Sequence, residues 1–205
     1  MPKNPTKPKT VRDNDFELVR AINDGDTERF HELVRRYERG LYHFGYRMCG
    51  NAPDAEDMVQ ETFINVFKYL KGFRYESKFK NWLYRIATSA CIKKKRKSKY
   101  APERELSLDD FVPKHPADQP TQLPDWAVMP LEKVLNDELA GQIKTAILDL
   151  PEKYRLVIVL RDVEGFSTEE AAQILNLTPS NIKVRLHRAR LFVREQLKGY
   201  FHDEH

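Results

Sequence analysis

The length, composition and charge of the chain exclude several classes of protein. It has 205 residues, of which 40% are hydrophobic, and a formal net charge of +4. A chain of this length and hydrophobic content can form one large or two small hydrophobic cores. No stretch approaches the roughly 20 consecutive apolar residues of a membrane-spanning helix. The basic, proline-rich start, residues 1–13, lacks the apolar segment of a secretory signal and is expected to be a disordered tail. Cys49 and Cys91 have no zinc-site spacing, so we expect a protein of the reducing cytoplasm without metal or cofactor.

Apolar residues at helical spacing predict a helical domain over residues 14–97. One amphipathic helix runs from Phe30 to Met48, and Gly50 and Pro53 then interrupt the chain. A third helix begins at about Ser77. The inner face of the helix between them is predicted to comprise Ala55, Met58, Val59, Thr62, Phe63, Val66, Phe67 and Leu70.

Residues 98–130 have a different composition. The stretch from Ala101 to Pro130 holds six prolines and no glycine, and its acidic residues outnumber its basic ones. Such a segment cannot form a long helix, and as a flexible coil it would span roughly 30 Å. We therefore predict an all-α protein of two small helical domains, residues 14–97 and 131–205, joined by an extended, acidic, proline-rich linker.

The second domain begins with two predicted helices, from Leu135 to Leu150 and from Pro151 to near Gly165. Within the latter, the run Val157–Leu160 resembles a buried strand, but no other segment offers a partner strand. We therefore interpret it as helical.

The segment from Glu164 to Arg194 predicts a helix-turn-helix. Ser167 and Glu170 have the spacing of a capping box, the turn falls at residues 176–178, and Pro179 suits a first helical position. A buried stripe of the second helix comprises Ile182, Leu186, Ala189 and Val193, and the cationic side comprises Lys183, Arg185, His187, Arg188, Arg190 and Arg194. A solvated charged face is the ordinary alternative, but acidic residues are confined to the first helix. The pattern therefore favours DNA binding.

Acidic residues gather at the start of the helix that follows Pro53. Asp54 and Glu56 are explained equally well by the favourable helix dipole. Asp57, Gln60 and Glu61 lie further along, where the dipole weakens, and suggest a polar docking face. No His, Ser or Lys constellation accompanies these carboxylates, so an enzyme site is not indicated.

Aromatic and cationic residues alternate between Phe73 and Tyr84, a composition that suits stacking on unpaired bases. The alternative is that the rings fill the core, which we favour for Trp82. A polar stripe follows, comprising Asn81, Arg85, Ser89 and Lys93, and leads into a basic run from Lys93 to Lys99. That run is either a solvated helix end, a patch like a nuclear-localisation signal, or a further DNA contact.

These segments together resemble bacterial RNA polymerase sigma factors of the sigma-70 family, in the extracytoplasmic-function (ECF) subfamily. The resemblance covers residues 14–97 and 131–197. DAEDMVQETF, residues 54–63, is similar to the polymerase-binding helix of the family. FRYESKFKNWLYRIA, residues 73–87, is similar to its −10-reading and promoter-melting segment. The stretch from Leu150 to Arg190 is similar to its −35-reading domain.

The resemblance implies a transcription initiation factor without catalytic activity. Its partners would be promoter DNA, the β′ clamp helices and β flap of core polymerase, and an anti-sigma factor, with no insertion into a membrane. The linker would follow the RNA exit path. Core polymerase would be bound by Asp54, Glu56, Asp57, Val59, Gln60 and Phe63. The −10 element would be bound by Phe73, Tyr75, Ser77, Lys78, Phe79, Asn81, Arg85, Ser89 and Lys93. In the helix-turn-helix from Thr168 to His187, the −35 element would be bound by Ser180, Asn181, Lys183, Val184, Arg185, His187 and Arg188.

Two residues depart from the family pattern, and two other functions stay open. Ser89 stands where members often carry Asn, and Lys93 where Asp commonly follows, which bears on −10 specificity. A helix-turn-helix regulator with a helical sensor domain would bind DNA alone as a dimer, but no dimerisation heptad is visible. A nuclease would need a second set of metal-binding carboxylates, which the acidic helix does not offer.

Overall fold

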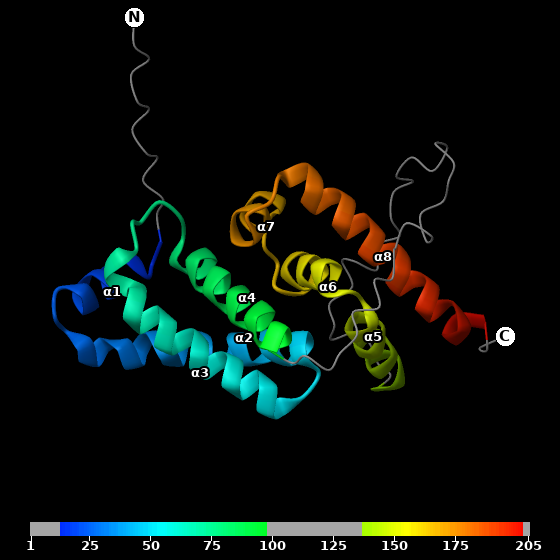
Figure 1. Ribbon diagram of the computed structural model, residues 1–205, viewed down its shortest axis with the longest axis horizontal. Helices are drawn as coiled ribbons and strands as arrows, with labels where there is room; N and C mark the ends of the chain where they lie inside the picture. The colour runs from blue at the N-terminus through cyan, green and yellow to red at the C-terminus, as the bar shows by residue number, and fades with distance from the viewer. Residues whose placement is uncertain (1–12, 98–136, 203–205) are drawn as a thin grey trace, which may run out of the picture. The chain divides into compact units, whose positions relative to one another are not determined.

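The computed structural model describes residues 13–97 and 137–202, and every regular element in these ranges is helical (Figure 1). The predicted all-α class is thus confirmed for the described chain. The described chain divides into two compact units. The first comprises residues 13–46 and 51–97, and the second comprises residues 47–50 and 137–202. The predicted basic tail, apart from Asp13, and the predicted linker at 98–130 lie outside the described residues.

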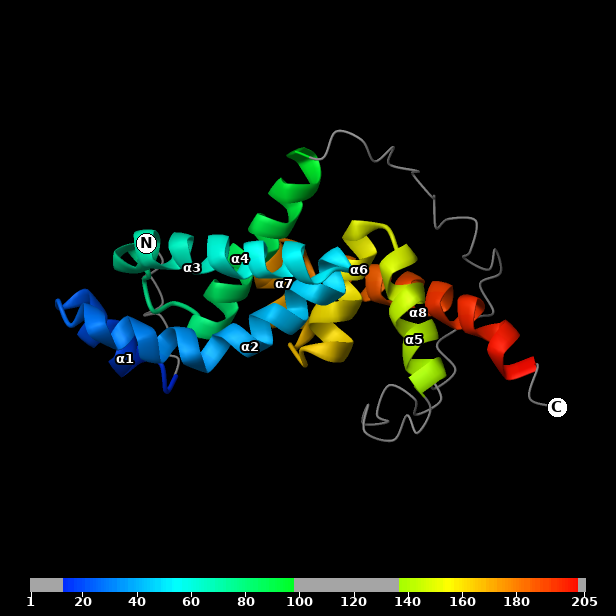
Figure 2. The same ribbon diagram turned by 90° about the horizontal axis from the view of Figure 1, so that it is seen from below.

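The first unit contains four α-helices and two 3₁₀ turns. Its elements are α1 (Phe16–Asn23), η1 (Thr27–Arg29), α2 (Phe30–Cys49) up to Tyr46, α3 (Ala52–Tyr69), η2 (Leu70–Gly72) and α4 (Phe79–Lys97). The three helices predicted from periodicity correspond to α2, α3 and α4. Helix α1 was not predicted, although Leu18, Val19 and Ile22 form its buried side. The views in Figures 1 and 2 show these elements from two directions.

Helices α2 and α3 approach closely because Gly45 faces α3. A Cβ atom at Gly45 would lie 2.4 Å from the Met58 Cε and 3.2 Å from the Ala55 Cα, so a side chain there would push the helices apart. Helix α3 begins at a local cap, since the Asn51 side chain accepts a hydrogen bond from the Asp54 amide at 2.9 Å. Helix α4 packs along α3. Buried side chains between these helices include Leu33, Leu41, Phe44, Met58, Val66, Phe79 and Leu83.

One predicted core residue of α3 lies on the surface instead. Phe67 is 54% exposed, whereas Phe63, one turn earlier, is 8% exposed. The Phe67 ring meets the ring of Phe30 edge-on, with centroids 5.1 Å apart. The prediction failed because the apolar stripe of α3 is wider than the surface that the neighbouring helices cover.

The second unit is organised around its last helix. Its elements are α5 (Asp137–Asp149), α6 (Glu152–Ile158), a π-helical turn η6 (Val159–Val163), α7 (Thr168–Leu175) and α8 (Pro179–His202). Helix α8 packs against α5, α6 and α7. The ambiguous run Val157–Leu160 is helical, as interpreted from the sequence, and its four residues are buried.

Candidate functional site

The helix-turn-helix is built by α7, α8 and the turn between them. The Ser167 Oγ accepts a hydrogen bond from the Glu170 amide at 3.1 Å, and the Glu170 carboxylate accepts one from the Ser167 amide at 2.9 Å. The predicted capping box is therefore confirmed. Asn176 ends α7 in the left-handed conformation, at φ 53°, which Asn tolerates better than most residues. The chain can thus reverse within three residues.

Helix α8 buries one stripe and exposes the opposite one. The Thr178 hydroxyl oxygen accepts a hydrogen bond from the Asn181 amide at 3.2 Å and so caps its start. The predicted buried stripe is confirmed, since Ile182, Leu186, Ala189 and Val193 are each at most 8% exposed. These residues fix which side of α8 faces solvent.

Most of the predicted −35 contacts lie on that solvent side. The exposed members are Ser180, Asn181, Lys183, Val184 and His187, whereas Arg185 and Arg188 are half-buried. Val184 is 52% exposed, so an apolar side chain stands among the polar ones near the start of α8. Both types of base-edge contact, hydrogen bonding and apolar contact with a thymine methyl, are therefore available on one stripe.

The environment of Arg190 differs from the one predicted. The sequence pattern places this residue on the cationic, DNA-facing side of α8. Its Nε and Nη2 atoms donate to the two carboxylate oxygens of Asp162, at 2.8 and 2.7 Å. Only 18% of the Arg190 side chain and 13% of the Asp162 side chain are exposed. The hydrogen bond to Asp162 raises the pKa of Arg190, so the guanidinium stays charged. Arg190 therefore joins α8 to η6, and its guanidinium is engaged within the unit.

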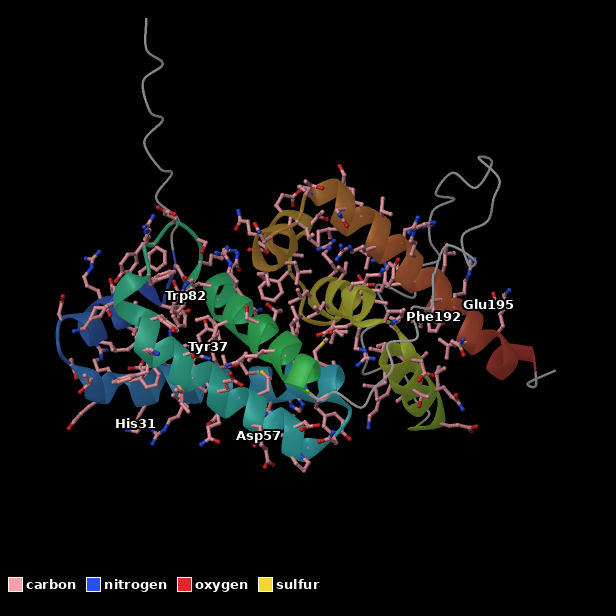
Figure 3. All side chains as sticks on the ribbon, viewed as in Figure 1. His31, Tyr37, Asp57, Trp82, Phe192 and Glu195 are labelled. Atoms are coloured by element: carbon pink, nitrogen blue, oxygen red, sulfur yellow. The ribbon has the colours of Figure 1, made fainter. Side chains whose placement is uncertain are left out.

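The outer face of α3 carries the predicted polymerase contacts. Glu56, Asp57 and Gln60 are exposed, and Asp57 points outward from the helix (Figure 3). Asp54 and Val59 are half-buried. Phe63 is 8% exposed and belongs to the core, which removes it from the candidate surface.

Two apolar side chains continue this face toward the end of α3, Ile64, which is 59% exposed, and Phe67, which is 54% exposed. Tyr69, 53% exposed, follows two positions later and lies on another side of the helix. Large exposed apolar side chains that cluster on one helix commonly mark a protein interface. Neither Ile64 nor Phe67 was among the predicted contacts, because the apolar spacing places Phe67 in the interior and Ile64 stands outside that stripe.

Three of the nine predicted −10 contacts are inside the first unit. Phe73 is 5% exposed, Phe79 0% and Asn81 4%. The Phe73 ring packs against those of Phe79 and Trp82, with centroids 5.8 and 5.3 Å apart. These side chains fill the core, so the base-stacking interpretation is wrong for the two phenylalanines and Asn81 offers no accessible contact.

The other six predicted −10 residues reach the surface. Lys78, Arg85, Ser89 and Lys93 are exposed, and Tyr75 and Ser77 are half-buried. The Ser89 hydroxyl donates to the Arg85 carbonyl at 2.9 Å, which leaves the hydroxyl oxygen as an acceptor toward solvent. Lys93 forms an exposed ion pair with Glu61 of α3 at 3.1 Å, an interaction of little strength in water.

Sequence reasoning missed a set of residues before α1 that contact both α2 and α4. The carboxylate of Asp15, which is 4% exposed, accepts hydrogen bonds from the Arg36 guanidinium and the Tyr37 hydroxyl. Burial, with the hydrogen bond to Asp15, raises the pKa of Tyr37, so the hydroxyl keeps its proton. The Asp13 carboxylate accepts a hydrogen bond from the Phe79 amide at the start of α4. The available signal was an Asp preceding the apolar pattern of Phe16, Leu18, Val19 and Ile22.

No group of three or more potential metal-ligating side chains occurs within the described ranges. Likewise, none of the helices in the described parts of the chain combines the length and apolar character needed to cross a membrane.

Comparison with known proteins identifies both units. The family model of sigma-70 region 2 matches residues 33–100, and that of sigma-70 region 4 matches residues 140–193. The helical units and the helix-turn-helix thus define a protein of the sigma-70 class.

Similarity to individual proteins identifies the subfamily within this class. The chain is 36% identical to the ECF RNA polymerase sigma factor SigW of Bacillus subtilis over 182 residues, covering 88% of this chain and 95% of SigW. It is 34% identical to the ECF sigma factor SigE of Mycolicibacterium smegmatis over 170 residues, 82% of this chain and 60% of SigE. The chain belongs to the ECF RNA polymerase sigma factors of the sigma-70 family.

Solved structures support the fold. The sigma factor RpoE of Bartonella quintana, solved in complex with the anti-sigma factor NepR, matches with a TM-score of 0.59 and 28% identity, covering 82% of this chain and 96% of RpoE. CnrH, solved with the cytosolic domain of CnrY, matches with a TM-score of 0.64 at 23% identity, covering 90% of this chain and 97% of CnrH.

Proposed function

We propose that this ECF sigma factor directs RNA polymerase to promoters through three surfaces. The exposed stripe at the start of α8 reads the −35 element, the surface of α4 and its preceding loop captures the −10 element, and the outer face of α3 binds core polymerase. The observation that carries the proposal is the geometry of α8. A capped helix with one buried stripe presents Ser180, Lys183, Val184 and His187 together on the opposite side.

The −35 assignment separates specificity from affinity. Residues near the start of a recognition helix meet base edges, whereas residues flanking that stripe meet phosphates. Lys183 lies on the exposed stripe, and Arg185 is turned partly toward the domain. Lys183 is therefore the candidate for base recognition, and Arg185 for the DNA backbone.

Lys183→Ala is expected to weaken binding to the correct −35 element by about 1–3 kcal/mol and binding to a scrambled element far less. Arg185→Ala is the matched control and should weaken both alike while lowering the salt dependence by about one unit. The measurement is binding of polymerase holoenzyme to promoter fragments over a salt series. Equal losses on both sequences for Lys183→Ala would show that a different face of α8 reads the bases.

The polymerase surface on α3 combines charge with apolar area. Asp57 and Gln60 are exposed on one side, and Ile64 and Phe67 extend that side by further helical turns. Specific protein interfaces usually combine an apolar area, which loses its water on binding, with polar residues at its edge. We assign the contact with core polymerase to this combined face.

Asp57→Lys is expected to weaken binding to core polymerase by about tenfold, because a reversed charge at an interface opposes its partner's charge. Folding should be unaffected, since exposed substitutions change stability by about 0.5 kcal/mol or less. Glu38→Lys, at an exposed acidic position on α2, is the control for net charge. The measurement is a titration of core enzyme with labelled variants, and unchanged affinity of a folded Asp57→Lys protein would remove α3 from the interface.

An anti-sigma factor is the proposed regulatory partner. The support is the similarity to RpoE of Bartonella quintana, which was solved in complex with the anti-sigma factor NepR. Co-purification from native cells, with probes for both core polymerase and an inhibitor, tests this assignment.

A further inference from the structure

The loop that enters α4 has a conformation that its own residues do not favour. Tyr75 lies in the left-handed region at φ 58°, which bulky residues rarely adopt. Between Gly72, which ends η2, and Phe79, which begins α4, no regular element supports the chain. Contacts from elsewhere in the fold must therefore hold this loop.

Besides the packing of Phe73 against Phe79 and Trp82 of α4, the loop is contacted by one short segment, Asp13–Phe16, here termed the anchor segment. The Phe16 ring meets the Tyr75 ring edge-on with centroids 5.1 Å apart, and the Phe73 ring at 6.0 Å. At the other end of the loop, the Asp13 carboxylate accepts the hydrogen bond of the Phe79 amide. The anchor segment thus contacts the loop both at its start and at its end.

Asp13 acts as a non-local cap of α4. One carboxylate oxygen accepts from the Phe79 amide and the other accepts from the Asp15 amide at 3.2 Å. The first amides of a helix have no partner within the helix, and a carboxylate there is favoured by the helix dipole. Ser77 and Lys78, which precede α4, do not supply this acceptor, so Asp13 reaches across 66 positions of sequence to do so.

The anchor segment is itself fixed to α2. Asp15 accepts hydrogen bonds from Arg36 and Tyr37 of that helix, and the Tyr37 ring packs against the Phe79 ring with centroids 5.7 Å apart. Tyr37 and Trp82 are both half-buried. The segment therefore transmits the rigidity of the core to the loop.

We propose that Asp13 and Phe16 are positioning residues, which hold residues 74–78 in the conformation that captures the −10 element. This inference rests on the proposed −10 function of the loop and of α4. Neither residue contacts DNA; each orders the side chains that do. Capture of an unstacked base needs a preformed surface, because ordering a flexible loop on binding reduces affinity.

The experiment measures binding of holoenzyme to a fork-junction DNA, in which the −10 non-template strand is single-stranded. Asp13→Ala and Phe16→Ala should each weaken binding to this probe by about tenfold and flatten the base preference at the −10 positions. Asp13→Asn keeps one acceptor oxygen for the Phe79 amide but none for the Asp15 amide, and should bind with an affinity between those of Asp13→Ala and the wild type. Glu17→Ala, at an exposed position on α1, should bind as the wild type does.

Separate measurements exclude a purely structural effect. Affinity for core polymerase, and binding of a duplex fragment that carries only the −35 element, should be unchanged in all four variants. The proposal is overturned if Asp13→Ala and Phe16→Ala bind the fork with wild-type affinity and preference. It is also overturned if both lose core binding and fork binding in equal measure, since that pattern reports unfolding of the unit.

Lys78→Ala distinguishes this inference from the proposed function. If Lys78→Ala changes −10 binding and Asp13→Ala does not, only the positioning role is wrong. If neither changes it, the loop does not bind the −10 element and both are wrong.

Discussion

Phe79→Ala is expected to lower the free energy of unfolding of the first unit by about 3–5 kcal/mol, the usual cost of emptying a buried phenylalanine site. Phe79 is 0% exposed and contacts the rings of Tyr37, Phe73 and Trp82. The measurement is denaturant unfolding followed by the fluorescence of Trp82, whose ring centroid lies 5.7 Å from that of Phe79. The second tryptophan, Trp126, is replaced by Phe so that the signal reports the first unit alone.

Phe67→Ala is the matched control for that experiment, because it removes the same ring from a position that is 54% exposed. It should change stability far less, and it should weaken binding to core polymerase instead. Unaltered stability of Phe79→Ala, together with an altered base preference at the −10 element, would restore Phe79 to the DNA-binding surface.

Arg190→Ala is expected to destabilise the second unit by about 2–4 kcal/mol, because it leaves the largely buried carboxylate of Asp162 without its bidentate partner. The measurement is hydrogen exchange of the amides of α8, which resolves this unit within the full-length chain. Replacing both residues, Arg190→Met with Asp162→Leu, removes the unpaired charge and should recover much of the protection.

The same variants test the alternative role of Arg190 at the DNA. If Arg190 contacted a phosphate, Arg190→Ala would lower the salt dependence of DNA binding by about one unit and leave the exchange of α8 unchanged. That outcome would contradict the structural role. A loss of protection without a change in salt dependence is the result that the ion pair predicts.

Local patterns in the sequence were sufficient to predict the local structure. The Ser167–Glu170 capping box, the position of Pro179 and the buried stripe of α8 depend on residues within a few positions of one another, and the structure confirms all three. The same is true of α2, whose apolar spacing is long and regular.

Features that depend on distant residues were not predictable in this way. The helical period alone places Arg190 on the cationic side of α8, and nothing in the pattern shows that a π-helical turn brings Asp162 to it. Composition also does not distinguish an aromatic that stacks on a base from one that packs in a core. Phe73 and Phe79 have the residue type expected of both, and only their burial separates the two roles.

The origins of the helix caps also differ in a way that bears on the order of folding. Helices α3 and α7 each carry a cap supplied three residues away, by Asn51 and Ser167, so their first turns can form as soon as those residues are made. The cap of α4 is instead supplied by Asp13, which is 66 positions away in the sequence. The hydrogen bond from the Phe79 amide to Asp13 can therefore form only after the intervening chain has closed into a loop, which costs conformational entropy. We therefore expect the start of α4 to form after α3 and to be the first of these helix ends to open in the native protein. A transiently opening start of α4 would let the −10 surface loosen and re-form while the core of the unit stays folded.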